Sequence, residues 1–120
     1  MLRVVHFEIP ADNPQRAGEF YQGVFGWKIQ KWEGPQPYWL CDTGTGPGIN
    51  GGIMQRSPQF QTVVNTIDVP SVDEYTKKIA GAGGKVVAPK MAIPKVGYLA
   101  YCLDTEGNIF GIMQSDSSAK

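Results

Sequence analysis

The sequence predicts an α+β fold made of two tandem βαβββ modules within a single domain of 120 residues. Three observations lead to this prediction: a repeated strand motif, the same order of strand and helix signals in both halves, and a polar, proline-bearing join at 56–59. The motif Gly-Ile-Met-Gln stands at 52–55 and again at 111–114. An internal repeat of this period indicates one supersecondary unit used twice, with module one at about 1–56 and module two at about 60–116.

The first half reads as a strand, a helix and three further strands. Residues 2–9 are apolar and β-branched, which is typical of a strand. Asn13 then provides a helix cap, and Pro14 fits the first helical position. Apolar residues at helical spacing predict the buried face of this helix: Ala17, Phe20, Tyr21 and Val24. Further strands are expected at 27–32, 38–43 and 51–55.

The second half repeats that order. Residues 62–69 read as a strand, and Ser71 with Glu74 forms a capping-box pattern that starts a helix. The predicted buried face of this helix comprises Val72, Tyr75 and Ile79. Further strands are expected at 85–88, 98–103 and 109–114.

Two segments of the second half allow more than one interpretation. Residues 90–97 are expected to be a plain connecting loop. The alternative is a flap over a binding site, in which Lys90 or Lys95 reaches an anionic group of a ligand. Residues 104–108 predict a turn with a glycine of positive φ, and residues 115–120 read as a polar tail.

Composition excludes several function classes. The formal net charge is zero, with 11 basic and 11 acidic residues, so neither nucleic acid nor an anionic membrane surface is an expected partner. No apolar stretch is long enough to span a membrane and no secretory signal is evident, so we expect a cytoplasmic protein. Cys41 and Cys102 do not have a metal-binding spacing. Buried free thiols are the expected state, with a disulfide or a reactive thiol as the alternatives.

Several motifs in this order resemble the vicinal oxygen chelate superfamily, which includes glyoxalase I, extradiol dioxygenases and bleomycin-resistance proteins. The resemblance covers essentially residues 3 to 114 and is carried by these motifs: His6, Phe20-Tyr21, Phe25-Gly26-Trp27, Ala82-Gly83-Gly84-Lys85 and Asp104-Thr105-Glu106-Gly107-Asn108. The last motif has threonine where the family pattern has proline. The resemblance implies a curved, half-open eight-stranded mixed sheet with a concave cleft, and it implies a homodimer.

The resemblance also implies where a metal would bind. Metal-using members place one ligand on the first strand and one on the last strand of each module. These four positions fall on His6, Val64, Gly52 and Gly111, of which only the histidine can ligate through its side chain. Even with Glu8 as a second ligand from the same strand the site would be poor, since catalytic zinc sites use three protein ligands. We therefore expect no metal and no other cofactor.

His6 and Glu8 are the candidate catalytic residues. His6 is the only histidine and could act as a general acid or base near neutral pH; the alternative is a structural, hydrogen-bonded histidine. Glu8 lies two residues on, so it shares the strand face of His6. It lines the cleft, pairs with a basic residue such as Arg3, or faces solvent. A shared partner of both side chains would let the carboxylate raise the pKa of the imidazole.

The predicted ligand-binding residues lie on the last two strands of the modules. A glycine within a strand marks a close approach of backbone or ligand. Strand glycines could therefore leave room for a flat or bulky ligand over the methionines two residues on, unless the two halves pack against each other there. We expect these residues to contact a ligand: Gly52, Met54, Tyr98, Tyr101, Gly111 and Met113.

The sequence thus favours a glyoxalase/bleomycin-resistance-like protein that binds a small, partly apolar molecule in the concave cleft without a metal. A metal-free lyase or isomerase that uses His6 and Glu8 as acid and base is the alternative. A metal-dependent glyoxalase or dioxygenase is a further alternative, and so is an accessory domain whose concave face is filled by its own side chains or a partner.

Overall fold

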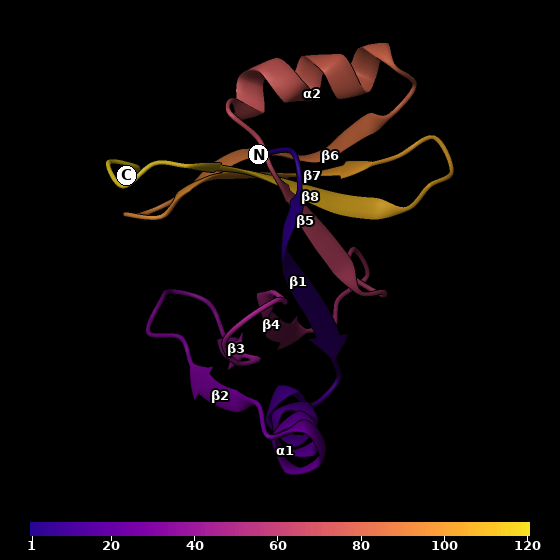
Figure 1. Cartoon of the computed structure of the whole chain (residues 1–120). Coiled ribbons are helices and arrows are strands. Elements are labelled where there is room, and N and C mark those ends of the chain that lie inside the picture. The colour runs from indigo at the N-terminus through magenta and orange to yellow at the C-terminus, as the bar shows by residue number, and fades with distance from the viewer. The chain divides into compact units, whose positions relative to one another are not determined.

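The computed structural model describes residues 1–120 and contains two helices and eight strands in the order βαβββ-βαβββ (Figure 1). The chain forms two compact units, one of residues 6–64 and one of residues 65–120 together with residues 1–5. The α+β class and the two βαβββ modules predicted from the sequence are confirmed. Neither helix is long and apolar enough to cross a membrane.

The first module orders its strands β2-β3-β4-β1, with β1 parallel to β4 and the other neighbours antiparallel. Helix α1 begins where the sequence predicts, because the side chain of Asn13 accepts the N–H of Arg16 and Pro14 follows the cap. The helix ends at Gly26, whose φ of 75° is left-handed. The elements are β1 (Val4–Ala11), α1 (Pro14–Phe25), β2 (Lys28–Lys31), β3 (Tyr38–Asp42) and β4 (Asn50–Gln55).

The face of helix α1 that packs on the sheet differs from the face predicted from the spacing of its apolar residues. Ala17 and Tyr21 pack on the core, but Phe20 and Val24 are 56% and 58% exposed. Gly18 explains the rotation: it is buried, and a Cβ there would lie only 3.0 Å from Ile29 Cγ2. The missing side chain lets the helix approach the sheet along the Gly18 side. The apolar core of the module comprises Ala11, Cys41 and Ile53, surrounded by Phe7, Ile9, Ala17, Tyr21, Trp27, Ile29 and Trp39.

The second module has the equivalent strand order β5-β8-β7-β6, with β5 parallel to β8. Ser71 caps α2 as predicted, since its hydroxyl accepts the N–H of Glu74. The core gathers Val69, Val72, Ala100 and Ile112, with Ile67, Tyr75, Ile79, Tyr98 and Phe110 packed against it. The elements are β5 (Val64–Asp68), α2 (Val72–Gly81), β6 (Lys85–Ile93), β7 (Gly97–Leu103) and β8 (Ile109–Ser115).

Equivalent glutamines at the ends of β4 and β8 support the internal repeat. Gln55 Nε2 donates to the carbonyl of Asp12, just before α1, at 3.0 Å. Gln114 Oε1 accepts the N–H of Val72, the first residue of α2, at 3.0 Å. Each last strand thus holds the start of the helix in its own module.

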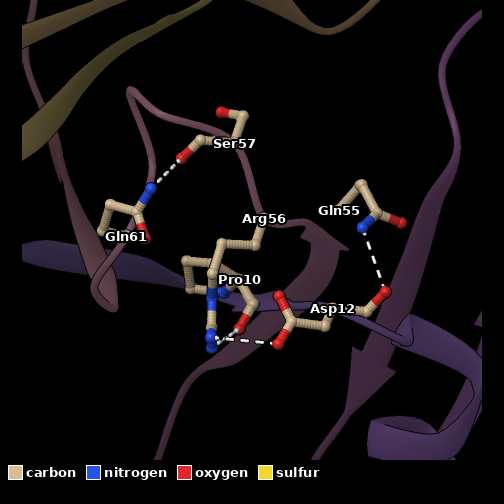
Figure 2. A network of polar contacts seen from close by, with 6 residues as sticks. All are labelled: Pro10, Asp12, Gln55, Arg56, Ser57 and Gln61. Carbon is tan, nitrogen blue, oxygen red and sulfur yellow. Dashed lines mark hydrogen bonds and ion pairs between the residues drawn. The ribbon is translucent and has the colours of Figure 1, made fainter.

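In the first module a second side chain strengthens this link (Figure 2). Arg56 donates from Nη2 to the carbonyl of Pro10 at 3.1 Å and pairs with the Asp12 carboxylate at 3.5 Å. Its backbone N–H also bonds to the carbonyl of Ala11. The connection between β1 and α1 is therefore fixed to the end of β4, which sets the position of the first strand.

Residues 90–93 of the segment 90–97 form a strand and not the plain loop that the sequence suggested. Strand β6 continues to Ile93, so only a short turn separates it from β7. Lys90 pairs with Asp73 at 3.0 Å and lies over the ring of Tyr98, so its charge serves its own module. The polar tail after β8 also folds back: Ala119 is 4% exposed, and its carbonyl accepts the N–H of Lys95.

Candidate functional site

The two faces of the first module's sheet differ in chemistry because side chains alternate along each strand. Phe7 and Ile9 of β1 point into the core beneath α1, so His6 and Glu8 point to the other face. Strand register brings further predicted residues to that face. Glu8 is paired with Gly52, and Tyr38 with Met54. We call this surface the His6 face.

Tyr38 lies on the His6 face, although the sequence analysis did not single it out as a site residue. Its hydroxyl lies 2.7 Å from Nε2 of His6, and the two rings are close to parallel at 13°. The Tyr38 ring lies directly over Gly52, because a Cβ at that position would overlap it. Gly52 therefore does mark a close approach, but the neighbour is Tyr38, and the space predicted for a ligand at this glycine holds that ring.

Burial favours the neutral form of His6. The imidazole is half-buried, and burial lowers its pKa from the ordinary value of 6.5, while the charge of Glu8 acts in the opposite direction and raises it. The sequence analysis anticipated only the effect of Glu8, which here is the smaller of the two. A neutral imidazole keeps one acceptor nitrogen, so the Tyr38 hydroxyl can donate to Nε2.

The depressed pKa of His6 predicts a pH dependence of stability. The unfolded chain takes up a proton on His6 as pH falls below 6.5, while the folded chain resists it. We therefore expect the free energy of unfolding to decrease from pH 7 to pH 5. Urea titrations at several pH values measure this slope, and His6→Asn should flatten it over that interval. If the free energy of unfolding of His6→Asn depends on pH as strongly as that of the original chain, His6 is not the group responsible.

The single histidine also permits a direct test of its two neighbours. With the Tyr38 hydroxyl as the donor, its bond to Nε2 favours the neutral ring, so we expect Tyr38→Phe to raise the pKa of His6. Glu8→Gln removes the charge that favours the protonated ring, so we expect that pKa to fall further. The proton on Cε1 of His6 gives one NMR signal to follow against pH. Opposite shifts in the two variants are the expected pattern, and a shift of both in one direction would disprove it.

In the second module, only some of the predicted ligand-binding residues lie on the same face of the sheet. Gly111 is paired with Thr66 on one side and with Tyr101 on the other. Gly111 leaves room for the buried Thr66, whose Oγ1 would lie 2.7 Å from a Cβ at that glycine. Met113 follows two residues later and has the same orientation. This face also contains Leu99, paired with Met113.

Tyr98 does not share that face with the other predicted residues of the second module. Tyr98 and Tyr101 are three residues apart on the continuous strand β7, so their side chains point to opposite sides. Tyr98 packs against the core beneath α2 with the ammonium of Lys90 4.7 Å from its ring. Strand parity alone separates these two tyrosines.

A shallow hollow of about 210 Å³ lies away from the His6 pair, between the end of α1 and the loop after β3. Two of its polar side chains serve the loop: Asp42 accepts the N–H of Gly44, and the Thr43 hydroxyl donates to the carbonyl of Ile49. The hollow is lined by Gly26, Lys28, Asp42, Thr43, Gly44 and Thr45.

Comparison with known proteins places this geometry in a family. A glyoxylase-like domain-containing protein of Didymella fabae is 30% identical over 115 residues, which are 88% of each chain. The chain belongs to the vicinal oxygen chelate superfamily. Within this glyoxalase-like chain, residues 3–36 match the family described as bleomycin resistance protein-like N-terminal.

Other relatives of the glyoxalase-like chain differ in length or share only the fold. A putative glyoxylase, CFP32, of Mycobacterium bovis is 32% identical over 113 residues, but the chain spans only 42% of its length. A methylmalonyl-CoA epimerase of Streptomyces coelicolor superposes with a TM-score of 0.73 over 100% of this chain and 99% of that one, at 13% identity. A hypothetical protein of Bacillus halodurans gives a TM-score of 0.74 at 13% identity, covering 98% and 97% of the two chains. At such identity the likeness shows the fold alone.

The residues of this glyoxalase-like chain do not fit the metal site that its superfamily implies. Of the four implied positions only His6 carries a ligating side chain. Val64 is fully buried, Gly52 is covered by Tyr38, and Gly111 adjoins Thr66. No group of three or more histidine, cysteine, aspartate or glutamate residues is arranged to hold a metal ion.

The two cysteines are buried free thiols, as predicted. Burial raises the pKa of Cys41 to about 11 and also raises that of Cys102. Since the thiolate is the form that attacks or binds a metal, neither cysteine is suited to those roles at neutral pH.

Proposed function

We propose that the protein binds a small, partly apolar molecule on the His6 face of its first module, without using a metal. The observation that supports this most directly is the half-buried hydrogen bond between His6 and Tyr38 beside apolar side chains. Leu40 of this face is 41% exposed, and Met54 is partly exposed. Apolar walls with a few well-placed polar groups are the usual make-up of small-molecule sites.

The comparisons agree with this proposal at a coarse level. The bleomycin resistance protein-like match at 3–36 includes His6 and Glu8. Bleomycin-resistance proteins sequester a ligand without chemistry, which is the mode of action proposed here. The printed names of the relatives refer instead to glyoxylases.

A thermal-shift screen of uncharged and charged small molecules tests binding, because a ligand that binds only the folded chain raises its melting temperature. Compounds that bind should lose much of their shift in Leu40→Ser, which removes exposed apolar surface from the His6 face. Val96→Ser is the matched control, since Val96 is similarly exposed, at 48%, in the second module. The proposal fails if no compound shifts the melting temperature. It also fails if Leu40→Ser and Val96→Ser reduce the shift by the same amount for every compound that binds.

A metal-free lyase or isomerase is the second candidate function. It is favoured by the neutral imidazole of His6 and the carboxylate of Glu8 on one face, since the carboxylate can accept a proton and the N–H of the imidazole can supply one. The test is deuterium uptake from D2O into carbonyl compounds with an acidic C–H. Loss of one such group typically costs about 10²–10⁴-fold in rate, so His6→Ala and Glu8→Gln should each abolish exchange. Exchange that survives both variants would exclude this role.

A metal-dependent glyoxalase or dioxygenase is the function that the relatives' names suggest and the ligand positions disfavour. Elemental analysis after incubation with nickel, zinc, manganese and iron(II) decides it. We expect no stoichiometric metal; metal that binds and is lost in His6→Ala would reverse this conclusion. The homodimer implied by the resemblance also remains a prediction, which a light-scattering mass would check.

A further inference from the structure

We infer that the exposed side of helix α1 is an interaction surface, and that its partner is α1 of a second copy of this chain, packed antiparallel. The surface contains three side chains spaced by four residues along the helix, Arg16, Phe20 and Val24, together with Phe25 in the last turn. We call it the α1 patch. The inference does not depend on the proposed ligand binding, which concerns the His6 face.

The α1 patch exposes large apolar side chains that are held in fixed positions. Phe20, Val24 and Phe25 are 56%, 58% and 61% exposed. Phe20 meets Tyr21 edge-on at 5.2 Å, and Phe25 stacks with the same ring at 6.2 Å. Tyr21 is in turn stacked on Trp27 at 4.9 Å. Because the rings beneath them hold the two phenylalanines in place, less side-chain entropy is lost when a partner covers them.

The equivalent side of α2 shows how the repeat is built where it faces solvent. Counted from the two N-caps, Arg16 and Phe20 of α1 occupy the positions of Glu74 and Lys78 in α2. Glu74 and Lys78 form an ion pair at 3.2 Å along the helix. Both helices cover the sheet of their own module, so covering the sheet does not require an apolar residue at Phe20. A contact with another surface accounts for it.

The charges of α1 favour an antiparallel copy as the partner. Anions stabilise the first turn of a helix and cations the last turn. Helix α2 follows this rule, with Asp73 and Glu74 in its first turn and Lys78 in its last. Helix α1 has no acidic residue in its first turn, no basic residue in its last turn, and Arg16 near its start. An antiparallel copy would bring each Arg16 to the negative end of the other helix, and a two-fold axis makes this contact twice.

The same arrangement gives the exposed side chains apolar partners. Phe25 lies in the last turn of α1, so Arg16 of one copy can stack on Phe25 of the partner subunit, a contact that arginine favours. With Phe20 near the two-fold axis, its ring lies beside Gly23 of the partner subunit. A Cβ on Gly23 would meet nothing within 4 Å, so there is open space for a ring at this position.

The size of the α1 patch predicts a weak dimer. A phenylalanine side chain buries about 150–250 Å² when fully covered, so the exposed parts of the two rings amount to on the order of 200 Å² per copy. Stable protein–protein interfaces bury about 1,200–2,000 Å² in total. Two α1 patches therefore form an interface of the weak, transient class, and we expect the dimer to dissociate on dilution.

Sedimentation equilibrium of the full chain over a series of protein concentrations tests this inference. We expect the mean mass to rise with concentration, from that of one chain towards that of two. Phe20→Lys introduces the residue that α2 has at this position and removes the central ring, which should raise Kd by about thirtyfold. Arg16→Glu should also raise Kd, because it places a negative charge at the negative end of the partner helix.

Val63→Lys is the matched control, since Val63 is 57% exposed in the same module but lies outside α1, and Kd should not change. The double variant Arg16→Glu/Phe20→Lys reproduces the ion pair of α2, so it should stay folded by circular dichroism and remain monomeric. Three outcomes would overturn the inference: the mass of one chain at every concentration, equal weakening by Phe20→Lys and Val63→Lys, or a tighter dimer in Arg16→Glu.

Discussion

Replacing Ile53 by alanine is expected to lower the free energy of unfolding by about 2–5 kcal/mol, the usual cost of truncating a fully buried isoleucine. Ile53 is 0% exposed and lies on β4 at the centre of the first module's core, beneath α1. The variant loses apolar burial and leaves a cavity that the neighbouring strands can close only in part. Urea unfolding followed by circular dichroism measures the change.

The internal repeat supplies a matched partner for this variant. Ile112 is the equivalent residue of β8 and is 2% exposed, so Ile112→Ala should cost the second module a similar amount. Val63→Ala provides the surface control, since Val63 is 57% exposed. A loss in Ile53→Ala no greater than in Val63→Ala would mean that the core is placed wrongly.

Gly51→Ala is expected to destabilise the chain more than Gly52→Ala, although the two glycines are adjacent. A Cβ on Gly51 would overlap the backbone carbonyl of Phe7, its partner on β1, so the strands themselves must move. The nearest atoms to a Cβ on Gly52 belong to the outer end of the Tyr38 side chain, which can rotate away. Overpacking typically lowers the free energy of unfolding by about 1–3 kcal/mol, occasionally more. We expect the loss in Gly51→Ala to lie at the upper end of this range.

The two glycine variants should also differ in the state of His6. Gly52→Ala displaces the Tyr38 ring, so it should break the 2.7 Å contact and change the pKa of His6 in the direction of Tyr38→Phe. Gly23→Ala serves as the control, because a Cβ there meets nothing within 4 Å and alanine favours the helix by about 0.5–1 kcal/mol. Equal destabilisation by the two strand variants would show that β1 and β4 are not in this register.

The repeat made the fold predictable from the sequence. The motif shared by 52–55 and 111–114 places the last strand of both modules, and local cap signals at Asn13 and Ser71 locate both helix starts. Such signals are read within a few residues and need no knowledge of the tertiary structure. The sequence also predicts which residues of β1 share a face, because the alternation of side chains along a strand puts His6 and Glu8 on one side.

Features that depend on packing or register were not predictable in the same way. The contact between Tyr38 and His6 requires the pairing of β3 with β4, which brings the ring over Gly52. Helix α1 rotated because Gly18 allows a closer approach, which left the apolar Phe20 exposed. Strand parity, in contrast, was available in the sequence and would have separated Tyr98 from Tyr101.

Each module contains one buried cysteine, so thiol labelling can measure the local opening of each module separately. Cys41 lies in the core of the first module and Cys102 on the middle strand of the second, and both thiols are held protonated by burial. A thiol reagent can react only when the surrounding strand opens, because it needs an exposed thiolate. Labelling rates of the Cys102→Ser and Cys41→Ser variants would therefore time the opening of the first and the second module separately, without any introduced probe.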